Sequence, residues 1–254
     1  MTAPLFLLAP GDLDAAVPGS EAEVTGAEAR HAAAAMRLAP GEEVLLADGT
    51  GAYAQGTVVD AAPTLLRVRL ERLGHEPDPA PRLVLVQALA KGDRDLMAVQ
   101  AATELGVDAV VPWEAERSIV RWRGPKAARA HQKWEDTVRA AAKQARRARV
   151  PEVRPHLSGI DLACLAGPGE GPAPLVLVLH EEAQHGFDAL GPERLTAAEE
   201  IVLVVGPEGG ISPAELTAAV AAGAVPVRLG SHVLRASTAG PAALAVLQHL
   251  LGRW

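Results

Sequence analysis

Beyond residue 82 the chain alternates continuous apolar runs with segments of helical spacing, and this rhythm constrains the fold more than any other feature. The apolar runs are RLVLVQAL at 82–89, DAVVPW at 108–113, LVLVLH at 175–180 and EIVLVVG at 200–206. Helical spacing occupies 93–105, 213–222 and 237–250. Buried strands that alternate with helices predict an α/β domain, in which helices cover both faces of a parallel sheet. Ligands bind beyond the carboxyl ends of such strands, so the loops after Val205 and Leu229 are the first candidate sites.

A different rhythm precedes residue 74. Short runs that alternate apolar and polar residues, with the Asp48-Gly49 turn between two of them, are typical of a small β-barrel. One helix is expected over 27–36. The proline-rich segment that follows has the composition of a linker. We therefore expect a β-barrel domain over 1–74, a linker over 75–82 and an α/β domain over 83–254.

The cysteine content limits the classes of site that the chain can form. Cys164 is the single cysteine among 254 residues, so an internal disulfide and a cysteine-rich metal site are excluded. His180 and His185 stand one residue too far apart for the zinc-protease pair and are interpreted as loop residues. No apolar run approaches the roughly 20 residues that span a bilayer. We expect a cytoplasmic protein that uses neither metal nor membrane.

The charge is distributed unevenly along the chain. A formal net charge of −7 argues against a nucleic-acid partner. Residues 117–149, however, contain eleven Lys and Arg against two acids, a charge of +9, which leaves −16 for the remainder. The spacing over 126–149 predicts a long basic helix, which could be only a solvated face or could lie along an RNA backbone. The residues expected to contact RNA are Arg139, Lys143, Arg146 and Arg147.

A glycine-rich turn, GPEGGIS at 206–212, leaves one buried strand and enters a helix. Glycines let a ligand approach the backbone, and a helix N-terminus offers unpaired N–H groups. Ser212 is the expected N-cap, Pro213 suits the first helical position and Glu215 completes a capping box. The turn lacks the lysine of a phosphate-binding P-loop and the spacing of the dinucleotide fingerprint. A well-capped turn without a ligand is the alternative interpretation.

A second loop at 227–240 also joins a strand to a helix through glycine. Its apolar residues Leu229, Val233 and Leu234 are suited to gripping a flat heterocycle, and Arg235 is suited to meeting an anion. Taken alone, Arg235 is more often a solvated or ion-paired residue. The two glycine loops together carry more information than either one.

The ordered combination of these segments resembles a known family. GPEGG at 206–210, followed by the loop that contains Leu229, Gly230, Val233, Leu234, Arg235, Thr238 and Ala239, is similar to the signature of bacterial 16S ribosomal RNA (uracil-N3)-methyltransferases of the SPOUT superfamily. The segments TELGV at 103–107 and ERS at 116–118 resemble the same family, as do the residues from His31 to Arg37. The resemblance covers nearly the whole chain.

This resemblance implies a PUA-like barrel for RNA docking and an α/β domain whose last segments form a trefoil knot. It also implies a homodimer that acts on ribosomal RNA or the small ribosomal subunit, and the cofactor S-adenosyl-L-methionine. The residues implied to bind the cofactor are Leu179, Gly206, Glu208, Gly209, Gly210, Leu229, Gly230, Val233, Leu234, Thr238 and Ala239. Ser237 departs from the pattern, because many relatives have glutamate there.

Methylation of uracil N3 requires removal of a proton or stabilisation of the deprotonated ring. We expect Arg235, and Arg117 from the partner subunit, to stabilise the developing negative charge, and no general base can be named. Two alternatives remain open. Ser237 favours a non-catalytic RNA-binding factor in ribosome assembly, and a related SPOUT methyltransferase would act on another RNA, such as transfer RNA.

Overall fold

The computed structural model describes residues 3–166 and 174–254, which divide into two compact units. Unit 1 comprises Met1–Asp78 and Ala142–Val150, and unit 2 comprises Pro79–Ala141 and Pro151–Trp254. The domain boundaries expected from the sequence assign 142–150 to the second domain. Ala148 explains the different grouping, because it packs with Leu5, Leu7 and Ala47 in one apolar cluster.

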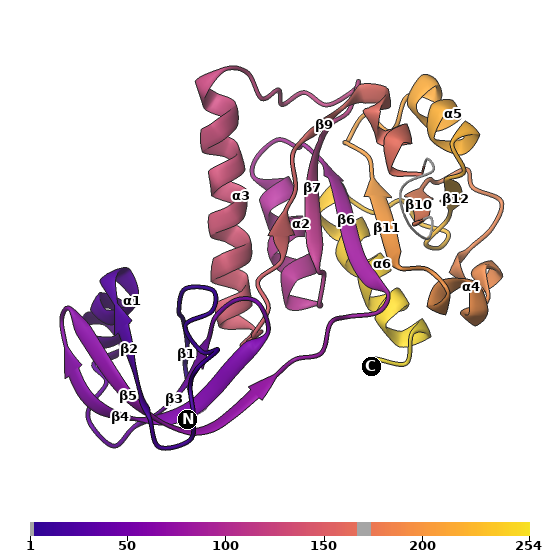
Figure 1. Ribbon diagram of the computed structural model, residues 1–254. Helices are drawn as coiled ribbons and strands as arrows, with labels where there is room; N and C mark the ends of the chain where they lie inside the picture. Colours follow the sequence, from indigo (N-terminus) through magenta and orange to yellow (C-terminus); the bar gives the residue numbers. More distant parts are fainter. Residues whose placement is uncertain (1–2, 167–173) are drawn as a thin grey trace. The chain divides into compact units, whose positions relative to one another are not determined.

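Unit 1 is a curled five-stranded sheet with strand order β1-β3-β4-β5-β2 (Figure 1). Its elements are β1 (Leu5–Leu7), β2 (Glu21–Thr25), α1 (Gly26–Arg30), η1 (His31–Met36), β3 (Glu43–Ala47), β4 (Ala52–Ala62) and β5 (Leu65–His75). Register shifts at Gln55/Gly56 and Val58/Asp60 bend the long β4–β5 pair, which lets the sheet enclose one apolar core around Phe6 and Leu66. Strand β2 was not predicted from the sequence, because it is a mostly exposed edge strand rich in polar residues.

Unit 2 is an α/β domain, which confirms the expected fold class. Its elements are β6 (Arg82–Ala88), α2 (Arg94–Glu104), β7 (Ala109–Glu114), α3 (Pro125–Gln144, of which 142–144 belong to unit 1), β8 (Glu152–Val153), β9 (Leu157–Ser158), η2 (Gly159–Leu165), β10 (Leu175–Leu179), η3 (Phe187–Leu190), α4 (Pro192–Thr196), β11 (Glu200–Val205), α5 (Pro213–Ala221), β12 (Val225–Val227) and α6 (Ala236–Leu250). The strand order is β12-β10-β11-β6-β7-β8, β9 pairs with β7, and each of these pairs is parallel.

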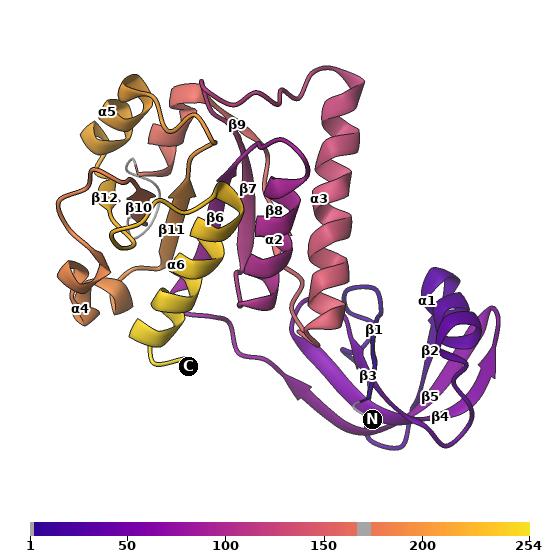
Figure 2. The same cartoon turned by 180° about the vertical axis from the view of Figure 1, so that it is seen from behind.

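Helices cover both faces of this sheet. Helices α2 and α6 lie side by side on one face, which is turned toward the viewer in Figure 2. Helix α5 and the 3₁₀ segment η2 contact each other and pack on the other face, where Leu162 and Ala219 join the sheet side chains in one core. After the edge strand β12, α6 returns to contact β11 and β6. This return path is the part of the topology in which the resemblance implies a trefoil knot.

The basic helix is shorter than the sequence predicts. Helix α3 ends at Gln144, and Arg146 has a φ of 56°, in the left-handed region that interrupts an α-helix. The prediction of helix over 126–149 is therefore wrong beyond residue 144. Within unit 2, Trp134 of α3 is buried and meets the Trp122 ring edge-on, with ring centroids 5.9 Å apart.

Candidate functional site

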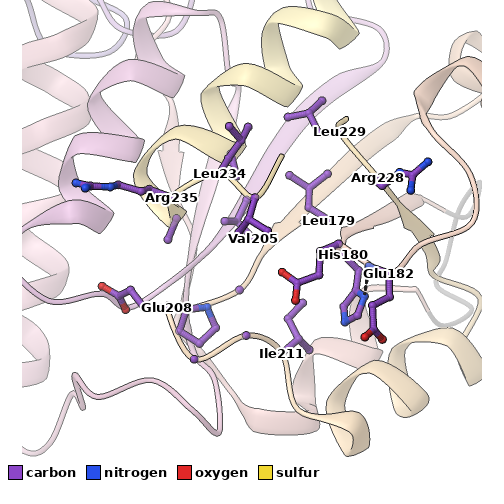
Figure 3. Close-up of a pocket in the computed structure, with 18 of the residues that line it drawn as sticks. Leu179, His180, Glu182, Val205, Glu208, Ile211, Arg228, Leu229, Leu234 and Arg235 are labelled. Atoms are coloured by element: carbon purple, nitrogen blue, oxygen red, sulfur yellow. Dashed lines mark hydrogen bonds between the residues drawn. The ribbon is translucent and has the colours of Figure 1, made fainter. Parts of the chain in front are cut away.

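A cavity of about 700 Å³ lies at the carboxyl ends of β10 and β11, within unit 2 (Figure 3). Strand β10 lies between β12 and β11, and the three strands are parallel. The loops that follow Leu179, Val205 and Val227 therefore meet at one edge of the sheet, and all three contribute to the cavity wall. The site is where the α/β topology predicts ligand binding.

Glycine and a helix cap shape the loop after β11, at residues 206–212. A Cβ on Gly206 would lie 2.7 Å from Ile211 Cγ1, and Gly210 has a φ of +74°, so a side chain at either position would strain the loop. Ser212 Oγ accepts the N–H of Glu215 at 3.3 Å, and Glu215 Oε2 accepts the N–H of Ser212 at 3.0 Å. The predicted capping box is confirmed, and it fixes the loop at the start of α5.

The carboxylate of Glu215 also binds a second loop. Glu215 is 1% exposed, and its Oε1 accepts the backbone N–H of Glu116 at 2.6 Å. The next residue, Arg117, donates from Nη1 to the carbonyl of Gly209 at 3.1 Å. The structure thus brings Arg117 of the same chain to the cavity, and the supply of an arginine by a partner subunit stays a prediction.

A second buried carboxylate, Glu114, holds the far part of the loop that carries Arg117. Glu114 Oε2 accepts the N–H of Trp122 at 2.9 Å, and Oε1 lies 2.8 Å from Arg123 and 3.3 Å from Arg121. Burial alone would raise the pKa of Glu114, but the Trp122 N–H and the Arg123 guanidinium outweigh it and hold the pKa below its ordinary value. Glu114 is therefore ionised at neutral pH and fastens residues 121–123.

The cavity has an apolar middle and two polar ends. Leu179, Val205, Leu229 and Leu234 lie between the ends in Figure 3. Glu208 and Arg235 extend on one side of these residues, and His180, Glu182 and Arg228 lie on the opposite side. At the first end, Arg94 of α2 forms an ion pair with Glu208 at 3.1 Å. At the second end, His180 Nδ1 accepts the N–H of Glu182 at 3.3 Å.

Most of the residues expected to bind the cofactor line this one cavity. They are Leu179, Gly206, Glu208, Gly209, Gly210, Leu229, Gly230, Val233, Leu234 and Ala239, and they are joined there by both expected catalytic residues, Arg117 and Arg235. Thr238 is not part of the lining; it lies in the first turn of α6, and its N–H donates to the carbonyl of Arg235 at 2.8 Å. The binding and catalytic roles of these residues remain predictions.

Several lining residues were not predicted from the sequence, and four of them are charged: Arg94, Glu181, Glu182 and Arg228. Arg228 directly follows β12, so its place at a carboxyl strand end was the available signal. Arg94 opens α2, and no local pattern indicates its contact with Glu208, which lies 114 residues later.

The four residues expected to contact RNA differ in their surroundings. Arg139 and Arg146 are exposed, and Arg147 is half-buried. The ammonium of Lys143 lies 2.6 Å from Glu28 and 5.9 Å from the centre of the Phe6 ring, all within unit 1. The charge of Lys143 is therefore balanced by an acid, whereas Arg139 and Arg146 present theirs to solvent.

Within residues 3–166 and 174–254 the structure contains neither a metal-binding cluster nor a membrane-spanning helix. These ranges contain no group of three histidine, cysteine, aspartate or glutamate side chains placed to hold a metal ion. None of the helices in the same ranges is both long and apolar enough to cross a membrane.

Comparison with known proteins assigns both parts of the chain. A family profile described as RNA methyltransferase domain matches residues 76–248, and one described as RNA methyltransferase PUA domain matches residues 24–71. A Mycobacterium bovis protein named ribosomal RNA small subunit methyltransferase E is 42% identical over 236 residues, covering 93% of this chain and 89% of the relative. The protein of that name from Bacillus subtilis is 26% identical over 231 residues, covering 89% of each chain.

Solved structures share the fold over nearly the whole chain. The ribosomal RNA small subunit methyltransferase E of Neisseria gonorrhoeae, bound to S-adenosyl methionine, matches with a TM-score of 0.83 and 28% identity, covering 98% of each chain. A Legionella pneumophila methyltransferase structure in complex with the same cofactor matches with a TM-score of 0.82 and 26% identity, again covering 98% of each chain.

Proposed function

Because this chain belongs to the RNA methyltransferase family that includes ribosomal RNA small subunit methyltransferase E, we propose that it methylates N3 of a uridine in 16S ribosomal RNA with S-adenosyl-L-methionine as the methyl donor. The observation that carries the proposal is the cavity formed by the two glycine loops, with three arginines in its wall near Glu208. The S-adenosyl methionine bound by the Neisseria gonorrhoeae relative supports the choice of cofactor.

The cavity residues fit this cofactor. Its middle is apolar and suits an adenine ring between Leu179, Leu229 and Leu234. Gly209 and Gly210 of one loop and Gly230 of the other leave the backbone exposed to the cavity, which suits hydrogen bonds to the adenine edge and the ribose. A cavity of about 700 Å³ lies within the range that encloses such ligands. When bound, the cofactor supplies a methyl group on a positively charged sulfonium.

The arginines supply the chemistry that the target base requires. A uracil ring must lose the N3 proton before or during methyl transfer, and negative charge then spreads to its carbonyl oxygens. Within the described residues the side chain of Arg235 has no hydrogen bond or ion pair, so its guanidinium is available to these oxygens and favours the deprotonated ring. Arg117, which is exposed and held against Gly209, is available beside it. Positioning of the two reactants accounts for most of the remaining rate.

The other parts of the chain serve RNA binding in this proposal. A PUA-like domain over 1–74 docks RNA, the linker over 75–82 follows, and the catalytic domain over 83–254 carries the cavity. The exposed guanidinium groups of Arg139 and Arg146 contact phosphates, with Arg147 beside them. The enzyme acts as a homodimer in the cytoplasm, on ribosomal RNA or on the small subunit.

The test combines cofactor binding with product analysis. Calorimetry of the full chain with S-adenosyl-L-methionine is expected to show one site per chain. Mass spectrometry of 16S ribosomal RNA from a deletion strain is expected to show loss of one N3-methyluridine, restored by the wild-type gene. Absence of cofactor binding would favour the non-catalytic assembly factor, for which Ser237 is the supporting feature. A methyluridine lost from transfer RNA instead would reassign the substrate.

A further inference from the structure

One end of the cavity carries more positive charge than the cofactor can use. Arg94, Arg117 and Arg235 line the cavity, and Glu208 pairs with the first of them. S-adenosyl-L-methionine has a sulfonium, an ammonium and one carboxylate, so its own net charge is positive. Surplus arginines repel such a molecule and attract an anion. On the proposed function, the anion that reaches this site is RNA.

The three arginines differ in what they contact. Arg117 donates to the carbonyl of Gly209, and Arg235 is without an ion pair in the described part of the chain. Of the three, Arg94 is the one bound to an anionic group, the carboxylate of Glu208 at 3.1 Å. Carboxylate and phosphate bind a guanidinium through the same donors. Glu208 therefore occupies the place that a phosphate oxygen would take.

This ion pair is weak enough to exchange. The side chain of Arg94 is 42% exposed and that of Glu208 is 31% exposed, so water screens their attraction. A phosphodiester that approaches Arg94 exchanges one oxygen anion for another. Displaced from Arg94, Glu208 would be free to turn into solvent, because its residue is exposed.

We propose that Arg94 binds a phosphodiester of the RNA strand beside the target nucleotide, and that Glu208 holds the Arg94 guanidinium in place until RNA displaces it. Arg94 is then a substrate-binding residue, and Glu208 is a positioning residue that also competes with RNA. This inference rests on the proposed function, because it takes RNA as the anionic substrate. It assigns the Glu208 carboxylate to Arg94 instead of to the cofactor.

The proposal predicts opposite effects on RNA affinity for substitutions at the two residues of the pair. Arg94→Gln removes the phosphate contact, whereas Glu208→Gln removes the competitor and leaves Arg94 free. Glu104→Gln is the matched control, since Glu104 is an exposed acid on the same helix whose carboxylate accepts an amide of Gln100 at 3.1 Å. The measurement is the affinity of each full-length variant for transcribed 16S ribosomal RNA as a function of salt, with S-adenosylhomocysteine present.

We expect Arg94→Gln to weaken RNA binding about fivefold near 0.1 M salt and to reduce the salt slope by about 0.7, the contribution of counterion release from one single-stranded phosphate. Glu208→Gln should bind RNA more tightly than both the wild type and Glu104→Gln. The double variant should bind like Arg94→Gln. Equal weakening by Arg94→Gln and Glu208→Gln would overturn the proposal, because it would mark the pair as purely structural. An RNA affinity of the Glu208→Gln variant equal to that of the Glu104→Gln control would also overturn the proposal.

Steady-state kinetics distinguishes whether Arg94 contacts a phosphate or the target base. A phosphate contact raises KM for RNA and leaves kcat and its pH profile unchanged in Arg94→Gln. A lowered kcat that recovers at alkaline pH, with KM unchanged, would overturn the proposal in favour of a contact with the deprotonated base. Failure of the proposed function is distinguishable, since it would appear in the wild type as absent methyl incorporation, whereas the binding measurements do not require turnover.

Discussion

The carboxylate of Glu215 accepts the backbone N–H of Glu116 at 2.6 Å, across 99 residues of sequence. The same side chain accepts the N–H of Ser212 with its other oxygen. One buried group therefore fixes the end of the glycine loop, at Ser212, and the start of the loop that presents Arg117. This double contact couples the wall expected to bind the cofactor to an arginine expected to act on the base.

Replacement of Glu215 by glutamine is expected to destabilise the full chain by about 1–3 kcal/mol, because an amide NH₂ would face one of the two buried N–H donors. Ser212→Ala removes the Oγ cap alone and is expected to cost about 0.5–2 kcal/mol. Urea unfolding measures both. Glu193→Gln, at an exposed acid in the first turn of α4, serves as the control. A Glu215→Gln protein as stable as this control would show that the double contact contributes nothing.

Removal of the Arg235 guanidinium is expected to slow methyl transfer and to leave cofactor binding intact. Arg235→Ala should lower kcat by about 100-fold, the loss typical of one donor to a developing negative charge. Its rate should rise more steeply with pH than that of the wild type, because alkali deprotonates the uracil without help. Arg194→Ala, on α4, controls for loss of a surface charge. Full turnover by Arg235→Ala with normal cofactor affinity would exclude this role.

Lys143 is expected to contribute to stability, whereas the exposed Arg139 and Arg146 are expected to contribute to RNA binding. Lys143→Met leaves the Glu28 carboxylate partly buried without its partner, which should cost about 1–3 kcal/mol in urea unfolding. Arg139→Gln combined with Arg146→Asn should leave stability nearly unchanged and reduce the salt slope of RNA binding by about 0.7 for each phosphate that is no longer bound. Asparagine suits position 146 because it tolerates the left-handed backbone. An unchanged salt slope in the double variant would contradict the assignment to RNA.

Low pH is expected to destabilise unit 2 through protonation of Glu200. This carboxylate accepts hydrogen bonds from both terminal nitrogens of Arg154, at 2.6 and 3.0 Å. These hydrogen bonds outweigh the effect of burial and lower the pKa of Glu200 below its ordinary value. A lowered folded-state pKa gives stability that is present above the unfolded pKa and lost as pH falls through the folded one. Glu200→Gln should therefore cost about 1–3 kcal/mol at neutral pH, with the difference from wild type shrinking in acid.

Urea unfolding between neutral pH and about pH 4 measures this dependence, in the range where carboxylates begin to protonate. Glu152→Gln is the control, because Glu152 contacts the same arginine at 3.3 Å but is 54% exposed. A cost of Glu200→Gln that is independent of pH would contradict the assignment.

Features set by neighbouring residues could be predicted from the sequence. The buried strands β6, β7, β10 and β11 follow from continuous apolar runs, and the capping box of α5 follows from Ser212 and Glu215 at fixed spacing. Both glycine loops were placed correctly between a strand and a helix, although β12, which precedes the second loop, is a half-buried edge strand. Polar edge strands such as β2 escaped prediction, since they lack an apolar signal.

Contacts between distant residues could not be predicted in this way. Arg94 and Glu208 are 114 residues apart, and Lys143 and Glu28 are 115 residues apart. Charge counting gave Lys143 and Arg139 the same expected role, because composition does not show which cation has an acid beside it. The end of α3 at Gln144 also escaped prediction, because arginine has no general preference for the left-handed backbone that Arg146 adopts.

The position of residues 142–150 has a consequence for how the protein is made. Val150 donates its N–H to the carbonyl of Gly49 at 3.0 Å, and Arg149 donates to the carbonyl of Glu76 at 2.8 Å. During synthesis the strands of unit 1 leave the ribosome first, but the segment that completes this unit follows only after β6, α2, β7 and most of α3. Unit 1 therefore reaches its final form late, when most of the strands and helices that precede residue 142 in unit 2 have already been synthesised.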